Sequence, residues 1–125
     1  MNLAHFSQNE FLCRCGCGEG PEKMDPGLLV MLEAAREAAG IPFVLSSAYR
    51  CAKHNRAVGG VAQSAHCRGY AVDIRCTDSA SRFRLLAALI AAGFRRIELA
   101  PTWIHVDTDP EKPAPCAFYQ AGGTY

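Results

Sequence analysis

The hydrophobic and polar positions along the chain predict two longer helices. In residues 25–39, Leu28, Leu32 and Ala35 fall on one stripe at the spacing of a helix face. An Asp-Pro pair opens this segment as N-cap and first helical residue, and a glycine ends it. The second helix is predicted over Ala80–Ala92, where a Thr-Asp-Ser run offers N-caps and a glycine follows.

Shorter segments complete the predicted order of elements. A capping box, a serine with a glutamate three residues later, opens a helical turn near the N-terminus, and a turn or two of helix is expected from Tyr49 to Val58. Four apolar or alternating stretches bounded by turns are typical of strands: Phe43–Ser47, Tyr70–Arg75, Phe94–Leu99 and Trp103–Thr108. This order predicts an α+β fold with a small mixed or antiparallel sheet and flanking helices. The tail, about residues 110–125, is rich in proline and glycine and is expected to be loose.

Length and charge limit the classes of protein. The chain has 125 residues, which predicts one domain over residues 1–125. Its 13 basic and 12 acidic residues leave a net charge of +1, so no nucleic-acid partner is expected. The longest mostly apolar run, Leu85–Phe94, is shorter than the about 20 residues of a membrane span, so no membrane insertion is expected. The first residues lack the features of a secretory signal, which predicts a cytoplasmic location at synthesis.

Cysteine is the unusual feature of the composition. The chain has seven, an odd number, so at least one cannot pair within the chain. Cys13, Cys15 and Cys17 lie in a glycine-rich segment of about residues 13–21 that is expected to be irregular, and Cys51 follows later. Structural zinc sites often pair cysteines with roughly two to four residues between them. A disulfide, a second, cysteine-bound metal and free thiols all fit this pattern.

Three further residues are suited to binding a metal. His66 precedes a predicted strand that contains Asp73, and His105 lies on the last predicted strand. Imidazole nitrogens and carboxylate oxygens bind zinc, and a catalytic zinc site uses three protein ligands with one position open to water. His66, Asp73 and His105 form such a set if the two strands lie side by side. The spacing also fits a loop histidine and a strand aspartate that only cap or pair locally.

Several short motifs occur in one fixed order along the chain. They are Ser47-Ala48-Tyr49-Arg50, His54-Asn55, Val58-Gly59-Gly60, Ser64-x-His66-x-x-Gly69-x-Ala71-x-Asp73-Ile74 and Ile104-His105-Val106-Asp107. Over about residues 5–108 this order resembles the peptidase M15 family of zinc D-Ala-D-Ala carboxypeptidases and peptidoglycan endopeptidases, in particular its small single-domain members of phage and prophage type. The resemblance implies the hedgehog/DD-peptidase fold.

The resemblance also implies roles for individual residues. His66, Asp73 and His105 match the zinc ligands of the family. Arg50 matches the arginine that faces the scissile carbonyl, where a permanent positive charge stabilises an oxyanion. Ser64 matches the serine beside the first ligand, either as a substrate contact or as support for that ligand.

The general base departs from the family pattern. Many relatives carry an acid three residues before the last zinc histidine, where this chain has Thr102, and a threonine does not take a proton from water near neutral pH. Asp107 lies two residues after His105, so on a strand both side chains point to one face, and it is expected in the site as base or as support for a ligand. Glu98 is the other candidate base. Trp103 shares the face of His105 and is expected to line the substrate cleft, unless it belongs to the core.

Together these features predict a zinc metallopeptidase, with one catalytic zinc ion, that acts on D-amino-acid-containing stem peptides of bacterial peptidoglycan. Removal of a terminal D-Ala and cleavage within the stem both fit the sequence. A monomer is expected, reaching the cell wall through holin-mediated release or as part of a virion. Two other functions fit the sequence: a non-catalytic zinc module that binds a partner, and a structural virion protein whose cysteines hold the metal.

Overall fold

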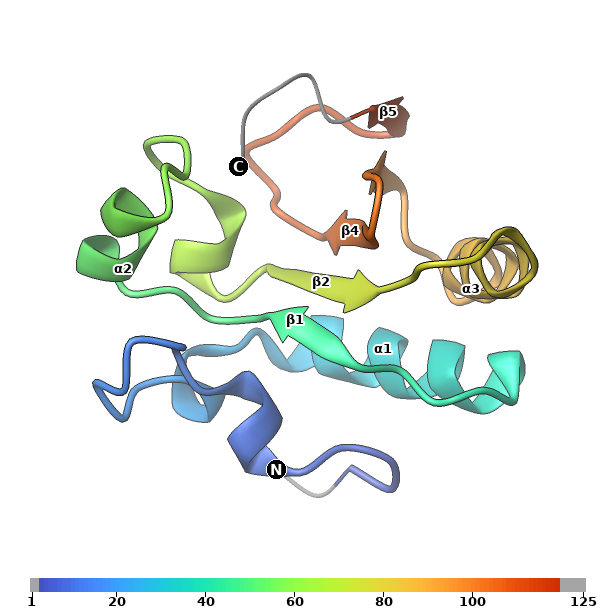
Figure 1. The fold of residues 1–125 in the computed structure, drawn as a ribbon, viewed down its shortest axis with the longest axis horizontal. Coiled ribbons are helices and arrows are strands. Elements are labelled where there is room, and N and C mark those ends of the chain that lie inside the picture. Colours follow the sequence, from blue (N-terminus) through green and yellow to red (C-terminus); the bar gives the residue numbers. More distant parts are fainter. Residues whose placement is uncertain (1–2, 120–125) are drawn as a thin grey trace.

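The computed structural model describes residues 3–119, and Figure 1 shows their fold. The helices are α1 (Pro26–Ala39), α2 (Ala52–Ala57) and α3 (Ser79–Ala91), with the short 3-10 helices η1 (Gln8–Phe11), η2 (Pro21–Lys23) and η3 (Ala65–Arg68). The strands are β1 (Leu45–Ser47), β2 (Ala71–Arg75), β3 (Arg96–Leu99), β4 (Trp103–Asp107) and β5 (Cys116–Tyr119).

The five strands of the described residues form one mixed sheet in the order β1-β2-β4-β3-β5. Antiparallel pairing joins β1 to β2, β2 to β4 and β4 to β3, whereas β5 runs parallel to β3 at the edge. The register of the two central strands places Asp73 opposite His105. The expected α+β class, with a small mixed sheet and flanking helices, is confirmed.

Alternation along the central strands gives the sheet two different faces. Val72 and Ile74 of β2, together with Ile104 and Val106 of β4, are buried in the hydrophobic core. The residues between them point to the opposite face, because successive side chains of a strand alternate. This opposite face carries polar side chains from β2, β4 and β3, and it is called the polar face below.

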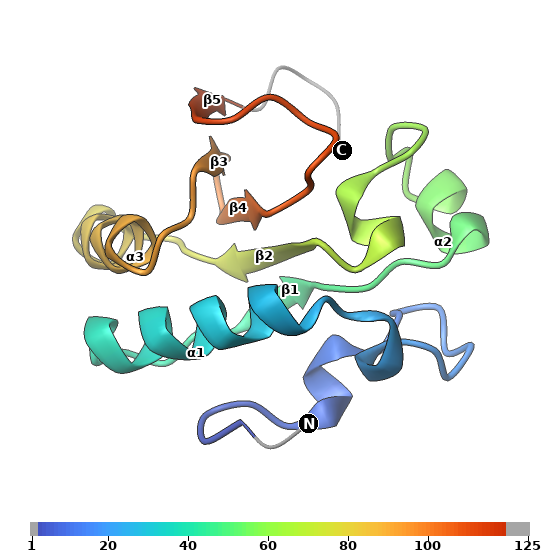
Figure 2. The ribbon, with the colours of Figure 1, turned by 180° about the vertical axis from the view of Figure 1, so that it is seen from behind.

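The apolar face is covered by the two long helices, whose buried stripes join the same core. Each helix begins at a capping aspartate: Asp25 accepts a hydrogen bond from the amide of Leu28 at 3.0 Å, and Asp78 accepts one from Ser81 at 2.8 Å. The buried helix residues are Leu28, Leu29, Leu32, Ala35, Leu85, Ala88 and Leu89. Figures 1 and 2 show α3 beyond the end of β2, and α2 and η3 beside its beginning.

The tail departs from expectation. The prediction of a loose segment from about residue 110 is wrong for Cys116–Tyr119, which forms β5 and pairs with β3. Arg96 of β3 holds this strand, because its guanidinium lies 4.7 Å from the ring centre of Phe118 and donates a hydrogen bond to the sulfur of Cys116. A four-residue strand after several prolines is too short to show a clear hydrophobic pattern in the sequence. It forms because it pairs with β3, which is distant along the chain. The rest of the predicted tail, residues 120–125, lies outside the described part.

Candidate functional site

A row of polar residues crosses the sheet on its polar face. The strand registers place Ser47 opposite Asp73, Asp73 opposite His105, and His105 opposite Glu98. Directly opposite residues on neighbouring strands have Cβ atoms about 4.5–5.5 Å apart, so these side chains are neighbours. The side chains of Asp73, His105 and Glu98 are almost entirely shielded from solvent.

His66 reaches this row from outside the sheet. It lies in η3, just before β2, and the hydroxyl of Ser64 accepts a hydrogen bond from the His66 amide at 3.3 Å. The ring Nδ1 of His66 lies 2.7 Å from the carbonyl oxygen of Ala48, which accepts its proton. Nε2 is therefore the nitrogen left for another partner, and it points at Oδ1 of Asp73, 3.2 Å away. This backbone contact fixes the tautomer and the orientation that a metal ligand needs.

His105 presents the other ring nitrogen, Nδ1, to Asp73. Its Nδ1 lies 2.8 Å from Oδ1 of Asp73, and its Nε2 donates a hydrogen bond to Oδ2 of Asp107 at 2.7 Å. Nδ1 of His105 and Nε2 of His66 thus converge on the same carboxylate oxygen. The three ligand atoms of His66, Asp73 and His105 all lie within 4.8 Å of one another. This set is called the His-Asp-His cluster below.

The charges of the cluster suit a divalent cation. Burial lowers the pKa of His66, which keeps its imidazole neutral and able to bind a metal. Burial acts to raise the pKa of Asp73, but the contacts of its carboxylate with His66 and His105 outweigh burial and hold that pKa below its usual range. The cluster therefore offers two imidazole nitrogens and an ionised carboxylate, the donor set that zinc prefers.

His105 shows where positive charge is favoured. Burial acts to lower the pKa of His105, but the hydrogen bonds to Asp107 and Asp73 raise it to about 9. Without a metal, His105 therefore holds a proton between two carboxylates. A metal ion at the Asp73 side would replace that proton, since metal ligands bind in their deprotonated form.

Asp107 supports His105 and has no free oxygen. Its Oδ2 accepts hydrogen bonds from His105 and from Nε of Arg96 at 3.0 Å, and its Oδ1 accepts one from the amide of Asp109 at 3.2 Å. Burial alone would raise the pKa of Asp107, but His105, Arg96 and this amide lower it below its ordinary value. Two roles are expected for Asp107, and these contacts favour the support of His105. A carboxylate whose two oxygens both accept hydrogen bonds is a poor proton acceptor.

Replacing Asp107 with asparagine is expected to weaken zinc affinity about 10–100-fold, the range measured when the partner of a metal-bound histidine is lost. The amide removes the charge that orients Nε2–H of His105. A competition titration against a chromophoric zinc chelator measures the change. Asp78→Asn is the matched control, because Asp78 caps α3 and lies outside the cluster. Equal zinc affinity in wild type and Asp107→Asn would contradict the supporting role.

Arg50 lies at the edge of the His-Asp-His cluster. Its guanidinium donates to Oδ1 of Asn55 at 3.0 Å and to the hydroxyl of Ser47 at 3.3 Å, and it lies 3.7 Å from Oδ2 of Asp73. Gly60 permits this arrangement, because a Cβ there would lie 1.9 Å from Oδ1 of Asn55 and 2.9 Å from Nη1 of Arg50. Arg50 is thus a fixed positive charge beside the His-Asp-His cluster.

The solvent side of the cluster is the side of Arg50 and Asp73. Each of these residues keeps 6% of its surface exposed, whereas His66 keeps 0% and His105 keeps 1%. A substrate entering from solvent would therefore meet the guanidinium of Arg50 and the carboxylate of Asp73 first. The arrangement combines a metal site with a cation at its entrance, which is suited to polarising and stabilising a carbonyl oxygen.

Glu98 lies on the far side of His105 from Asp73. It is 2% exposed, and its Oε1 is buried with no hydrogen-bond partner among the described residues. Burial raises the pKa of Glu98 to about 7, although the positive charges of His105 and Arg96 act to lower it. Burying an oxygen without a hydrogen-bond partner costs free energy. Oε1 of Glu98 is therefore a candidate to accept a proton or to contact a ligand.

The remaining predicted residues lie around the cluster. Ser64 is fully buried and holds the backbone of His66, so it is placed to support that ligand. Trp103 lies on β4 two residues before His105, on the same face, and is half-buried. Thr102 lies in the turn between β3 and β4, exposed, where its carbonyl accepts a hydrogen bond from the amide of Cys76.

The sequence interpretation missed Arg96. This residue links Asp107 to β5 through its contacts with Phe118 and Cys116. The available signal was the alternation along β3, where Arg96 and Glu98 alternate with the buried Ile97. That pattern places both charged residues on the polar face.

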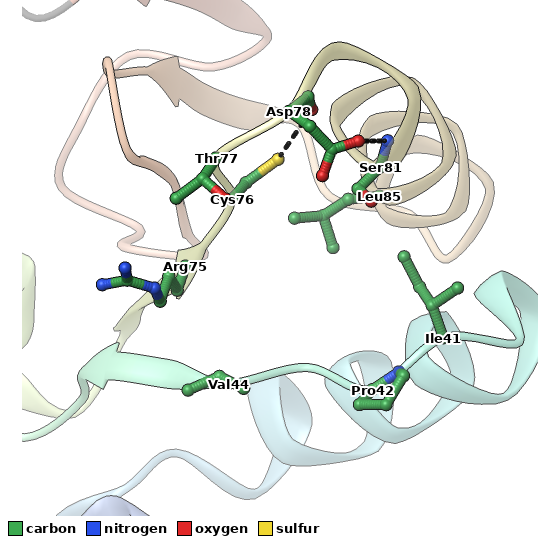
Figure 3. Close-up of a pocket in the computed structure, with 9 residues that line it drawn as sticks. All are labelled: Ile41, Pro42, Val44, Arg75, Cys76, Thr77, Asp78, Ser81 and Leu85. Carbon is green, nitrogen blue, oxygen red and sulfur yellow. Dashed lines mark hydrogen bonds between the residues drawn. The ribbon is translucent and has the colours of Figure 1, made fainter.

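A separate hollow of about 330 Å³ lies at the opposite end of β2, between the end of α1 and the start of α3 (Figure 3). Arg75 and Asp78 are the charged residues in its lining. Asp78 is engaged in capping α3 through the amide of Ser81, and its backbone carbonyl accepts a hydrogen bond from Cys76. The hollow has no group of metal-binding side chains, so the candidate chemistry lies at the His-Asp-His cluster.

None of the helices within residues 3–119 is long and apolar enough to cross a membrane.

The sequence was also compared with known proteins and protein families. The sequence matches no curated protein. A family model described as Peptidase M15 matches residues 4–107, which include Arg50 and the whole His-Asp-His cluster.

Proposed function

The chain belongs to the peptidase M15 family, and on this premise we propose that it is a zinc-dependent peptidase that hydrolyses D-amino-acid-containing stem peptides of bacterial peptidoglycan. The observation that carries the proposal is the convergence of two imidazole nitrogens and one carboxylate oxygen within 4.8 Å, with Arg50 3.7 Å from that carboxylate. A fixed cation beside three candidate metal ligands is suited to the hydrolysis of a peptide bond, because both stabilise negative charge on the carbonyl oxygen.

His66, Asp73 and His105 would hold the zinc ion through Nε2, a carboxylate oxygen and Nδ1. When bound, zinc polarises the carbonyl of the scissile peptide bond and lowers the pKa of water to about 7. Each imidazole is oriented by a hydrogen bond from the ring nitrogen that does not bind the metal. The carbonyl of Ala48 accepts this bond from His66, and Asp107 accepts it from His105. These contacts keep both imidazoles in the tautomer that leaves the ligand nitrogen free.

Arg50 stabilises the negative oxygen that forms when water adds to the carbonyl carbon. Its guanidinium is held by Ser47 and Asn55, so little reorganisation is needed when the charge develops. Burial lowers the pKa of Arg50, partly offset by Asp73, yet a guanidinium stays protonated at neutral pH.

Glu98 acts as the general base. It accepts a proton from the attacking water and passes it to the amine that leaves when the C–N bond breaks. Its position opposite His105 and its buried, unpartnered Oε1 support this role among the described residues. We assign Asp107 to the support of His105 instead, because both of its oxygens already accept hydrogen bonds.

Two residues complete the proposed site. Trp103 forms a wall of the substrate cleft beside His105, because the two side chains share the polar face of β4. Ser64 supports His66 through its backbone rather than touching the peptide, since it has no exposed surface. The partner of the site is the stem peptide of a muropeptide, taken up by a monomer.

The test is hydrolysis of purified muropeptides with intact stems, followed by mass spectrometry. We expect hydrolysis that stops when a chelator removes the metal and returns when zinc is added. Release of free D-alanine would identify a carboxypeptidase, and two shorter peptides would identify an endopeptidase. A protein that binds zinc at the His-Asp-His cluster but hydrolyses no stem peptide would refute the proposal and favour a non-catalytic zinc module.

A further inference from the structure

Four cysteines converge at the side of the molecule opposite α3. Cys13, Cys15 and Cys17 lie in the irregular loop between η1 and η2, and Cys51 directly precedes α2. Their sulfur atoms all lie within 4.8 Å of one another. Figures 1 and 2 show the loop and the beginning of α2 on the same side of the molecule. These four residues are called the cysteine cluster below.

The spacing of the sulfur atoms matches a tetrahedral metal site. Cys13 lies 3.4 Å from Cys15 and 3.8 Å from Cys51, and Cys15 lies 3.6 Å from Cys51. Four thiolates bound to zinc at about 2.3 Å in a tetrahedron lie about 3.8 Å from each other. The loop and the start of α2 therefore already hold the sulfurs at nearly the separation that one zinc ion imposes.

Backbone amides point at the same sulfurs. The amide of Cys51 donates to Sγ of Cys13 at 3.4 Å, and the amide of His54 donates to Sγ of Cys51 at 3.4 Å. Such contacts orient metal ligands and favour their deprotonated form. Lys53 lines the hollow that borders the cluster, where it offsets the net negative charge of four thiolates around a divalent ion.

The loop is shaped to present its cysteines on one side. Gly16 separates Cys15 from Cys17 and Gly18 follows Cys17, and their φ angles of +83° and +86° are ones that only glycine adopts readily. The amide of Cys13 donates to the carbonyl of Glu19 at 2.8 Å, which closes the loop. Cys15 and Cys17 remain exposed, so a metal ion can reach the cluster from solvent.

A disulfide explains this geometry less well. All seven cysteines are free, and the three measured sulfur separations are far longer than the about 2.05 Å of a disulfide bond. Pairing two of the four sulfurs would also leave the other two close together without a shared ligand. A single tetrahedral ion satisfies all four at once.

We infer that Cys13, Cys15, Cys17 and Cys51 bind a structural zinc ion, separate from the proposed catalytic one. This ion ties the N-terminal loop to the residue directly after Arg50. It closes the site with four protein ligands, so it leaves no position for water or substrate and serves structure rather than hydrolysis. The inference does not depend on the proposed peptidase activity.

The test is the metal content of the full chain by elemental mass spectrometry. We expect two zinc ions per wild-type chain, one in Cys15→Ser, one in His66→Ala and none in the double variant. Cys15 is exposed, so its replacement is compatible with folding. Cys76→Ser is the matched control, because Cys76 lies outside the cluster, and it should keep both ions.

A second measurement reports directly on which atoms bind the metal. Cobalt bound by thiolates has intense sulfur-to-metal charge-transfer absorption, whereas cobalt bound by imidazole and carboxylate does not. We expect this absorption in cobalt-loaded wild type and in His66→Ala, and its loss in Cys15→Ser. A wild-type chain with one zinc that His66→Ala removes, or with oxidised cysteines by thiol titration, would overturn the inference. Iron in place of zinc at the cluster would do the same.

Discussion

Replacing His66 with alanine is expected to abolish hydrolysis of stem peptides and to remove one zinc ion per chain. Asp73 and His105 alone leave two ligands, which is too few for a zinc site that must also hold water and substrate. The variant should still fold. Losing the donor to the Ala48 carbonyl costs about 1–3 kcal/mol, which is less than the roughly 5–15 kcal/mol of a typical domain.

Elemental mass spectrometry, a muropeptide assay and a circular dichroism spectrum together measure these effects. His5→Ala is the control, because His5 is exposed and pairs with Glu33, outside the His-Asp-His cluster. It should keep both zinc and activity. Continued hydrolysis by folded His66→Ala protein would show that the catalytic centre lies elsewhere in the molecule.

Replacing Glu98 with glutamine is expected to lower kcat about 10²–10⁴-fold while zinc content stays unchanged, the range for loss of a general base. The two side chains have nearly the same shape, so packing opposite His105 is preserved. Glutamine cannot accept a proton from water, and no hydrogen bond at Oε1 to the described residues is lost by the change.

Two variants separate this effect from general disturbance of the site. Glu33→Gln makes the same chemical change on α1, far along the chain from the cluster, and should leave kcat unaltered. Asp107→Asn should lower zinc affinity but retain much of the kcat once zinc is saturating, because it acts through His105. If Glu98→Gln keeps full kcat, the base is another group.

The sequence predicted correctly those elements whose pattern lies within a short stretch of chain. The capping aspartates before α1 and α3 and the alternation in β2 and β4 are read from neighbouring residues, and the structure has those elements. The family was identified correctly from the order of short motifs. Such motifs work because the residues around a metal must come from particular positions on particular elements.

The sequence could not decide which acid serves as base. The sequence favoured Asp107 as a site residue but left its role open, and Glu98 stayed a candidate base because a turn that contains Pro101 separates it from His105 and hides its direction. The register of β3 against β4 places Glu98 opposite His105, and Arg96, His105 and the amide of Asp109 occupy both oxygens of Asp107. Both facts depend on pairing and packing between strands rather than on periodicity.

By itself, the sequence determined the α+β class, the main helices and strands, and a set of residues able to bind zinc, because helix caps, strand alternation and motif order are properties of short stretches of chain. Only the tertiary structure decided that β5 pairs with β3, that Glu98 lies opposite His105, and that Cys51 meets the N-terminal cysteines. These are contacts between distant segments. Their geometry is set by which surfaces pack together when the whole chain folds, and no local pattern records it.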